Sequence, residues 1–297
     1  MSTVVITGGN GGVGRWIVDR FADHEERVVS IDLSTPDVRR DGVEFRAADL
    51  TEQGEASELI GRASPDVVIH AAAVPTGGVY AGGRTFETNV VSTYNVLEAA
   101  GAEDAKVVWF SSGAVYGALD GSDEYPVDER TSTRPTYPYA ASKLAGEAVA
   151  ELVANRDGVP VASLRPTWVQ HPGDYTGLQS RLDEVDLEEP DVDGAFWWYV
   201  DVRDVARAVE SAVDAVFEGH QVFNLDSGDN PTEVGLSALL EAIYDREPDR
   251  DLPSDGSGMS IQKADAVLDW RPRYTLTDGA TAAPDVSAFV TAGNPWV

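Results

Sequence analysis

The chain has 297 residues, no cysteine, and 51 acidic against 22 basic side chains, which gives a formal net charge of −29. A surface this negative repels phosphate backbones and anionic lipid, so we expect neither a nucleic acid nor a membrane as a partner. Without cysteine there is no disulfide, thiolate nucleophile or zinc–thiolate site, and 42 % hydrophobic residues are enough for an ordinary globular core.

Short apolar runs alternate with helical patterns through the first half of the chain. The first run, Thr3–Thr7, is followed by a glycine-rich turn and by Trp16, Ile17 and Phe21 at helical spacing. Runs of this length between helices predict a Rossmann-type α/β fold, a doubly wound parallel sheet with helices on both faces. The further runs are Val28–Ile31, Val43–Phe45, Val67–Ile69, Val107–Phe110 and Val159–Leu164, and helices are predicted at Glu52–Gly61 and Thr85–Ala100.

The pattern becomes less regular after about residue 165. A helix is predicted to start at Thr232, because Thr232 and Glu233 provide a cap and a first-turn acid. We expect residues 1–165 to form the main domain and 166–297 a small C-terminal substrate-binding lobe, with some segments returning to the main domain. The lobe contains the loop-like segment Gly173–Gly194, an amphipathic pattern at Asp204–Phe217 and a predicted strand at Gln221–Leu225.

The glycine-rich turn between the first strand and the first helix favours a dinucleotide site. Gly8 permits a tight turn, Gly11 lets the backbone approach a pyrophosphate, and Gly14 allows close packing of helix on strand. The start of the helix, at Gly12 and Val13, then faces the phosphates. A plain strand-to-helix turn is the alternative, but the position of these glycines in an alternating βα chain argues against it.

Asp32, at the end of the second predicted strand, indicates which dinucleotide is bound. A carboxylate there accepts hydrogen bonds from the ribose 2′-hydroxyl and repels a 2′-phosphate, so NAD is favoured over NADP. Arg39 and Arg40 lie nearby in the sequence and keep NADP as the alternative. Asp49, after the third predicted strand, is placed to reach the adenine edge.

Many ordered motifs resemble the extended short-chain dehydrogenase/reductase family, which contains nucleotide-sugar epimerases, dehydratases and several sugar dehydrogenases. The resemblance covers most of the chain, and it implies that Leu50, Ala71, Ala72, Asn89 and Pro166 join the cofactor site of an NAD-binding main domain. For Asn89, a helix-capping role is an alternative. The motifs are TGGNGGVG at 7–14, Asp32, DL at 49–50, HAAA at 70–73, NVVSTYNVLEAA at 89–100, FSSGAVYG at 110–117, YAASK at 139–143, RP at 165–166 and VDVRDVA at 200–206.

Tyr139 and Lys143 lie four residues apart, on one face of a helix predicted to begin near Pro138. An ammonium close to a phenol lowers its pKa, so Tyr139 can take a proton from a substrate hydroxyl while hydride leaves the same carbon for a nicotinamide. The resemblance implies that Lys143 also holds the nicotinamide ribose and that Ser112 hydrogen-bonds the reacting oxygen.

Neighbouring residues offer alternatives to this catalytic set. Tyr137 is a second phenol, but only Tyr139 has a lysine four residues later, and the chain has three lysines in all. Ser111 is a second hydroxyl beside Ser112. We interpret His70 as a packed histidine at a strand end rather than as a base, and no metal ligands are expected.

One position departs from the nucleotide-sugar enzymes of the family. They commonly carry an arginine that binds a diphosphate two residues before the aromatic of a YVHV-like segment, and Trp197 stands there in this chain. An indole cannot neutralise a diphosphate, so a nucleotide-sugar would need another anchor. The candidates are Arg181, Arg203, Arg271 and Arg273.

We therefore expect an NAD-dependent sugar dehydrogenase that oxidises the anomeric hydroxyl of a small aldose to its lactone. Uronate dehydrogenases of this family suggest such a reaction, but their asparagine and histidine after the catalytic serine are replaced here by Gly113 and Ala114, which argues against a uronate substrate. The alternatives are a nucleotide-sugar (UDP-glucose type) 4-epimerase or dehydratase with tightly bound NAD, and a non-catalytic NAD-binding redox sensor. The intact set of serine, tyrosine and lysine argues against the sensor.

The resemblance also implies a homodimer, in which helices at about 85–100 and 139–155 form a four-helix bundle. Leu144, Ala148 and Leu152 could instead face the sheet. The acidic excess and the scarcity of lysine indicate adaptation to high cytoplasmic salt, with an acidic enzyme of ordinary salt as the alternative. No apolar run long enough for a membrane span and no signal-peptide pattern occur, so we expect a cytoplasmic protein.

Overall fold

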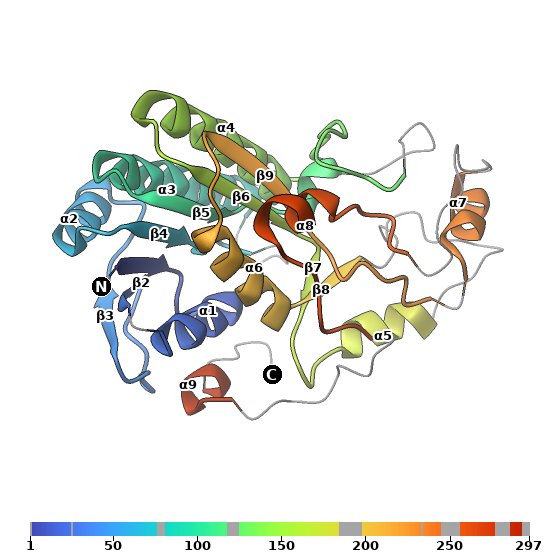
Figure 1. The fold of residues 1–297 in the computed structure, drawn as a ribbon, viewed down its shortest axis with the longest axis horizontal. Helices are drawn as coiled ribbons and strands as arrows, with labels where there is room; N and C mark the ends of the chain where they lie inside the picture. The colour runs from blue at the N-terminus through green and yellow to red at the C-terminus, as the bar shows by residue number, and fades with distance from the viewer. Residues whose placement is uncertain are drawn as a thin grey trace.

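The computed structural model describes residues 2–24, 26–75, 81–117, 125–183, 198–232, 234–244, 256–276 and 286–292. In these residues, seven parallel strands form one sheet in the order β3-β2-β1-β4-β5-β6-β9 (Figure 1). Runs rich in Val and Ile form them because both faces of the sheet are covered. The strands are β1 (Thr3–Thr7), β2 (Arg27–Asp32), β3 (Val43–Ala47), β4 (Val67–His70), β5 (Lys106–Phe110), β6 (Val161–Pro166) and β9 (His220–Leu225).

Helices cover both faces of this sheet, as Figure 1 shows, which confirms the doubly wound Rossmann-type prediction. One face packs against α1 and α6 through a core that includes Phe21 and Val209, and the other packs against α2, α3 and α4 through residues such as Ile60 and Leu97. The helices are α1 (Gly12–Ala22), α2 (Gln53–Ala63), α3 (Gly82–Ala102), α4 (Pro138–Asp157) and α6 (Val202–Asp214).

The carboxyl ends of the strands meet at one edge of the sheet. The register pairs Thr7 of β1 with Ile31 of β2 on one side and with His70 of β4 on the other. The strand order reverses at β1, so a crevice for a ligand is expected beyond the ends of β1 and β4. The loops that follow β5, β6 and β9 leave the sheet at the same edge.

The C-terminal part of the chain divides between this sheet and a smaller lobe. Two short strands, β7 (Trp168–Gln170) and β8 (Tyr199–Asp201), pair with each other in parallel, whereas β9 and α6 belong to the main sheet and its covering layer. The boundary expected at residue 165 stays a prediction. The remaining elements are the 3₁₀ turn η1 (Gly113–Tyr116) and the helices α5 (Thr176–Asp183), α7 (Leu236–Tyr244), α8 (Gln262–Leu268) and α9 (Ala288–Thr291).

Three local expectations for this part of the chain were wrong. The segment expected to be a loop from Gly173 contains helix α5. The helix expected from Thr232 begins at Leu236, because the backbone N–H and the hydroxyl of Thr232 both donate to Oδ1 of Asn230 and form a turn there. Helix α6 ends at Asp214 and not at Phe217, because Ala215 already has extended backbone angles.

Helix α3 packs one side against the sheet and exposes the other. Leu97 is fully buried against the sheet, whereas Tyr94 is 39 % exposed.

No helix in the described parts of the chain is both long and apolar enough to cross a membrane.

Candidate active site

The glycine-rich turn has the geometry that a dinucleotide pyrophosphate requires. Gly8 has a φ of +73°, and a Cβ there would lie 2.5 Å from the backbone nitrogen of Ala72. A Cβ on Gly14 would lie 2.0 Å from the carbonyl oxygen of Gly8, so helix and strand can approach this closely only without a side chain. Helix α1 begins at Gly12 without a side-chain cap, which leaves its first N–H groups available to an anion.

Asp32 lies beside this turn, where a ribose hydroxyl would need an acceptor. Its carboxylate accepts hydrogen bonds from the backbone N–H groups of Asn10, at 2.9 Å, and of Leu33, at 2.7 Å. Arg40 is bound elsewhere, because its guanidinium donates to Asp19 at 2.8 Å and pairs with a second acid of the same segment. Carboxylate and cation are thus arranged for a 2′-hydroxyl rather than for a 2′-phosphate.

The other residues expected at the cofactor site lie in the segments that follow β3 and β4. The carboxylate of Asp49 accepts hydrogen bonds from the N–H and hydroxyl of Thr51, and these bonds lower its pKa. Leu50 is buried, and its carbonyl accepts a hydrogen bond from Asn95 of α3 at 3.0 Å. Ala71 and Ala72 follow β4 and are partly buried against the turn at Gly8.

His70 is a packed histidine, as predicted. It is 1 % exposed, and its ring nitrogens share hydrogen bonds with Thr7 at 2.7 Å and with Thr93 at 3.2 Å. Burial, with a smaller contribution from Lys143, lowers its pKa to about 3. Because both of its nitrogens take part in hydrogen bonds, the neutral imidazole links β1, β4 and α3 and has no nitrogen free to act as a base.

Asn89 lies inside α3, which begins at Gly82, so the alternative of a helix-capping role was wrong. Its side-chain amide accepts from the backbone N–H of Val74 at 2.7 Å and donates to the carbonyl of Val74 at 3.1 Å. It also donates to the hydroxyl of Ser142 on α4, at 3.2 Å. Asn89 therefore joins the loop after β4 to both helices beside the crevice.

The structure brings together Ser112, Tyr139 and Lys143. Tyr139 lies in the first turn of α4, which starts at Pro138, and Lys143 follows one turn later. Lys143 is 4 % exposed; its Nζ donates to the carbonyl of Phe110 at 2.7 Å and lies 5.5 Å from the centre of the Tyr139 ring. The Ser112 side chain hydrogen-bonds Tyr139 and accepts from the N–H of Ala114 at 3.1 Å.

Burial controls the proton affinities of this group. It raises the pKa of Tyr139 to about 12, against the opposing effect of the hydrogen bond to Ser112. Burial also lowers the pKa of Lys143 to about 7. The lowered tyrosine pKa expected from the sequence is thus not found in the chain alone, because desolvation of the phenolate outweighs its neighbours.

A buried polar network behind Ser112, Tyr139 and Lys143 was missed by the sequence reasoning. The hydroxyl of Ser111 donates to Glu147 at 2.6 Å, and Arg165 donates to both carboxylate oxygens of Glu147 at 2.8 and 2.7 Å. Arg165 also donates to the hydroxyl of Tyr116, which donates in turn to Asn224 of β9 at 2.7 Å. The only signal for it was an acid one turn after Lys143 and an arginine before Pro166. The network fixes α4, β5 and β6 to one another.

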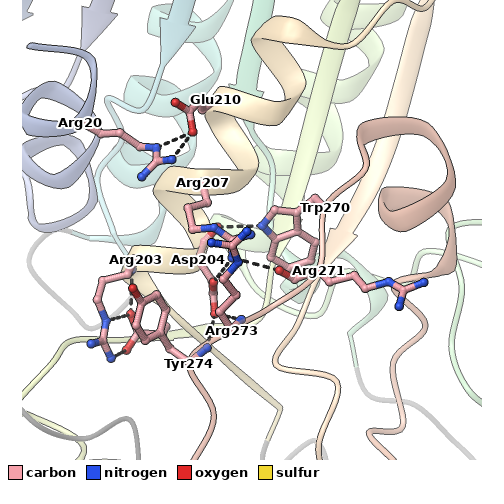
Figure 2. A network of polar contacts seen from close by, with 10 residues as sticks. Arg20, Arg203, Asp204, Arg207, Glu210, Trp270, Arg271, Arg273 and Tyr274 are labelled. Carbon is pink, nitrogen blue, oxygen red and sulfur yellow. Dashed lines mark hydrogen bonds and ion pairs between the residues drawn. The ribbon is translucent and has the colours of Figure 1, made fainter. Parts of the chain in front are cut away.

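Two of the arginines considered as diphosphate anchors, Arg203 and Arg271, are bound to acids. Arg203 donates to Asp201 at 2.8 Å and stacks on Tyr274, 3.7 Å from the ring centre (Figure 2). Arg271 pairs with Asp265 at 2.7 Å, while Arg273 is exposed. Trp197 and the side chain of Arg181 lie outside the described residues.

Pro166 ends β6, and its carbonyl would lie 3.4 Å from a Cβ on Gly113.

Comparison with known proteins gives a consistent result. The model of the NAD-dependent epimerase/dehydratase family matches residues 4–226. A putative UDP-glucose 4-epimerase of Methanocaldococcus jannaschii is 30 % identical over 93 % of this chain and 95 % of its own length. An L-arabinose 1-dehydrogenase (NAD(P)(+)) of Haloferax volcanii is 27 % identical over 84 % of this chain and 97 % of its own.

Solved structures share the fold. A UDP-glucose 4-epimerase of Thermotoga maritima, solved with UDP-glucose, superposes with a TM-score of 0.73 at 24 % identity, over 94 % of this chain and 96 % of that one. The fold, the glycine-rich turn and the group around Tyr139 thus occur together in a chain that aligns with such enzymes along almost its whole length.

Proposed function

Since this chain belongs to the NAD-dependent epimerase/dehydratase family, we propose that it uses NAD to oxidise a hydroxyl-bearing carbon of a sugar. The observation that carries the proposal is the convergence of Ser112, Tyr139 and Lys143 at the edge of the sheet that also holds the glycine-rich turn. The turn and Asp32 fit NAD, because they supply backbone donors for a pyrophosphate and an acceptor for a ribose hydroxyl.

The three side chains divide the work of the reaction. Ser112 donates to the reacting oxygen and orients it, and Tyr139 takes the proton of the substrate hydroxyl. Bound NAD supplies the acceptor for the hydride that leaves the same carbon. Lys143 holds the ribose hydroxyls and, when protonated, favours the phenolate of Tyr139. Because the pKa of Tyr139 alone is about 12, oxidation should be faster at alkaline pH, where more of the phenolate is present.

The reaction we favour is oxidation of the anomeric hydroxyl of a small aldose to its lactone. The support is electrostatic: of the candidate anchors whose side chains are described, Arg203 and Arg271 are paired with acids and so are not available to neutralise a diphosphate, which leaves the exposed Arg273. A free aldose needs no such neutralisation. The similarity to the L-arabinose 1-dehydrogenase of Haloferax volcanii supports the same reaction class.

A nucleotide-sugar 4-epimerase is the second candidate, because the chain is similar to the putative UDP-glucose 4-epimerase of Methanocaldococcus jannaschii. Such an enzyme would use the same tyrosine, serine and lysine, but its NAD would stay bound and be regenerated in each cycle. The two candidates differ in whether reduced NAD accumulates. That difference can be measured directly.

The test is turnover of the purified protein with NAD and a panel of free aldoses, uronates and UDP-sugars, in molar KCl. Net formation of reduced NAD with a free aldose, and lactone as product, supports the dehydrogenase. A changed sugar without net reduced NAD supports the epimerase. Binding of NAD with no turnover of any sugar would contradict both.

The role of Tyr139 has a matched control in Tyr137, whose ring stacks on that of Tyr139 at 6.3 Å. Tyr139→Phe should lower kcat by about 10²- to 10⁴-fold and leave NAD affinity unchanged, because only proton transfer is lost. Tyr137→Phe should change kcat only a few-fold. Equal effects of the two substitutions would contradict the assigned role.

We further propose that the protein is a homodimer paired through α3 and α4. Phe86, Val91, Tyr94 and Leu152 are exposed apolar side chains on these two helices, and Leu152 faces away from the sheet with 47 % of its surface exposed. Light scattering should give twice the chain mass, and Leu152→Glu should lower it to a monomer. A monomeric wild type would contradict the proposal.

Adaptation to high salt is the last part of the proposal. A net charge of −29 opposes the compact state through self-repulsion, and screening by salt relieves it. The melting temperature should therefore rise between 0.1 and about 2 M KCl. A melting temperature independent of salt would instead favour an acidic enzyme that is adapted to ordinary salt concentrations.

A further inference from the structure

His171 lies directly against the start of helix α1. It follows β7, and a Cβ on Gly12 would lie 3.3 Å from its Cε1 and 3.4 Å from its Nε2. Gly12 is the first residue of α1, whose first turn has no side-chain cap. The imidazole would therefore be in tight contact with a side chain at position 12, and it lies beside N–H groups that have no partner within the helix.

The fold holds the ring at this place through the β7–β8 pair. The register sets Gln170 opposite Asp201, and the carbonyl of His171 accepts a hydrogen bond from the N–H of Asp174 at 2.9 Å. Asp201 is itself fixed, because Arg203 donates to both of its oxygens at 2.8 Å. The backbone around His171 is thus determined by the lobe, while its side chain reaches the main domain.

Two carboxylates lie near the imidazole, which has no hydrogen bond within the described residues. Burial lowers its pKa, and the nearby carboxylates of Asp201 and Asp174 oppose that change. The positive end of α1 also disfavours a second positive charge there. On the elements packed here, Arg15 of α1 donates to the carbonyls of Asn10 and Phe289, and Arg203 is paired with Asp201.

We propose that His171 binds the pyrophosphate of NAD and thereby connects the substrate lobe to the cofactor. The inference rests on the NAD site of the proposed function. A pyrophosphate on the N–H groups of Gly12 and Val13 would lie beside the ring, which can donate a hydrogen bond from one nitrogen. A neighbouring anion favours the protonated imidazole, and the resulting hydrogen bond is charge-assisted.

This contact makes NAD binding depend on pH in a defined direction. If the anion raises the pKa of His171, the complex takes up a proton at a pH between the free and the bound pKa values. NAD affinity then increases as the pH falls through the bound pKa and becomes constant below the free pKa. A ring that only packs against Gly12 gives no such dependence.

Calorimetric titration with NAD and with ADP-ribose, at pH 6 and pH 8 in constant molar KCl, tests the contact without any sugar substrate. ADP-ribose keeps the pyrophosphate and lacks the nicotinamide. The decisive variant is His171→Phe, which keeps a ring against Gly12 but removes the donor and the charge. The control is His24→Phe, because His24 lies just beyond the opposite end of α1, where it pairs with Glu210.

We expect His171→Phe to weaken both ligands about 10- to 100-fold at pH 6, as for loss of a hydrogen bond to a charged group. The variant should also lose most of the difference between pH 6 and pH 8, while the control behaves like the wild type. In NMR spectra of the wild type, one of the four histidines should show a raised pKa when ADP-ribose binds, and its signal should be absent from His171→Phe.

Three outcomes would overturn the inference. Equal affinity of wild type and His171→Phe would show that the ring only packs. Loss of affinity for NAD but not for ADP-ribose would place the contact at the nicotinamide. Both leave the proposed function intact, whereas a wild type that binds neither ligand would overturn the NAD site and the proposed function together.

Discussion

The two halves of the molecule bury different kinds of side chain. In the half that contains the glycine-rich turn, the strands are filled by apolar residues such as Val5, Ile6 and Val68, which are fully buried. In the described residues, every fully buried carboxylate lies after residue 200: Asp201, Asp204 and Asp226. Apolar burial needs no particular partner, whereas a buried carboxylate needs donors at fixed positions. The first half is therefore ordered mainly by a repeating apolar pattern, with the buried ion pair of Glu147 and Arg165 near its end, whereas fully buried carboxylates organise the second half.

Asp204 shows how such a pair organises the second half (Figure 2). From α6 its carboxylate accepts from Arg207 at 2.6 Å and from the backbone N–H groups of Arg273 and Tyr274 at 2.8 Å. Its backbone carbonyl accepts from the indole of Trp270 at 3.0 Å. One residue thus fixes the whole segment from 270 to 274 against the helix.

The largest expected effect on stability follows from removing this carboxylate. Asp204→Ala should lower the free energy of unfolding by about 3–5 kcal/mol, because Arg207 and two N–H groups lose their acceptor inside the protein. Urea unfolding measures the change. A loss below about 1 kcal/mol would mean that the second half does not depend on its buried charges.

Asp226 gives the next largest effect, and one that depends on pH. Burial raises the pKa of Asp226 from its ordinary value of 3.8 to about 7. Between these two pH values the folded chain therefore keeps a proton on Asp226 that the unfolded chain has released. Stability should therefore fall as the pH rises through that range. Asp226→Asn should be more stable than the wild type by roughly 2–4 kcal/mol at pH 8 and equal to it at pH 4.

The control for this pH dependence is Asp37→Asn, at an exposed position of the first half. Its unfolding free energy should follow the wild type at both pH values. If Asp37→Asn and Asp226→Asn had the same profile, the pH dependence would come from general charge repulsion and not from the buried acid.

A smaller effect is expected in the first half, where the constraint is steric. In Gly14→Ala the new Cβ would meet the carbonyl of Gly8, so backbone has to move, at a cost of about 1–3 kcal/mol and with weaker NAD binding. Gly54→Ala is the matched control, because no atom lies within 4 Å of a Cβ there. That change within α2 should stabilise the chain by about 0.5–1 kcal/mol. Destabilisation by both would indicate that helix packing at Gly14 is not special.

The smallest effect is expected for an ion pair on the surface of the second half. Arg271 and Asp265 pair at 2.7 Å, but 74 % of the arginine side chain is exposed. Asp265→Ala should lower the unfolding free energy only slightly in dilute buffer, and still less in molar KCl, because water and salt screen an exposed pair. A loss of unfolding free energy close to that of Asp204→Ala would mean that burial does not determine how much an ion pair contributes to stability.

The sequence was a good guide wherever a residue acts through local geometry. Gly8 and Gly14 could be recognised because a positive φ and a close backbone approach both require glycine, and Tyr139 with Lys143 because a helix sets residues four apart on one face. The network around Glu147 could not be found in this way, because its members come from four elements far apart in the chain. The presence of a charged residue in a sequence does not indicate whether its side chain will bind water or another side chain in the folded protein.

By itself the sequence determined the fold class, the strands of the main sheet and the site of the cofactor turn, because apolar periodicity and glycine requirements are properties of short segments. Only the tertiary structure decided which acids are buried, that Lys143 has a pKa of about 7 and Tyr139 one of about 12, and that His171 meets Gly12. These properties depend on desolvation and on contacts between distant segments. Both arise only when the chain has folded.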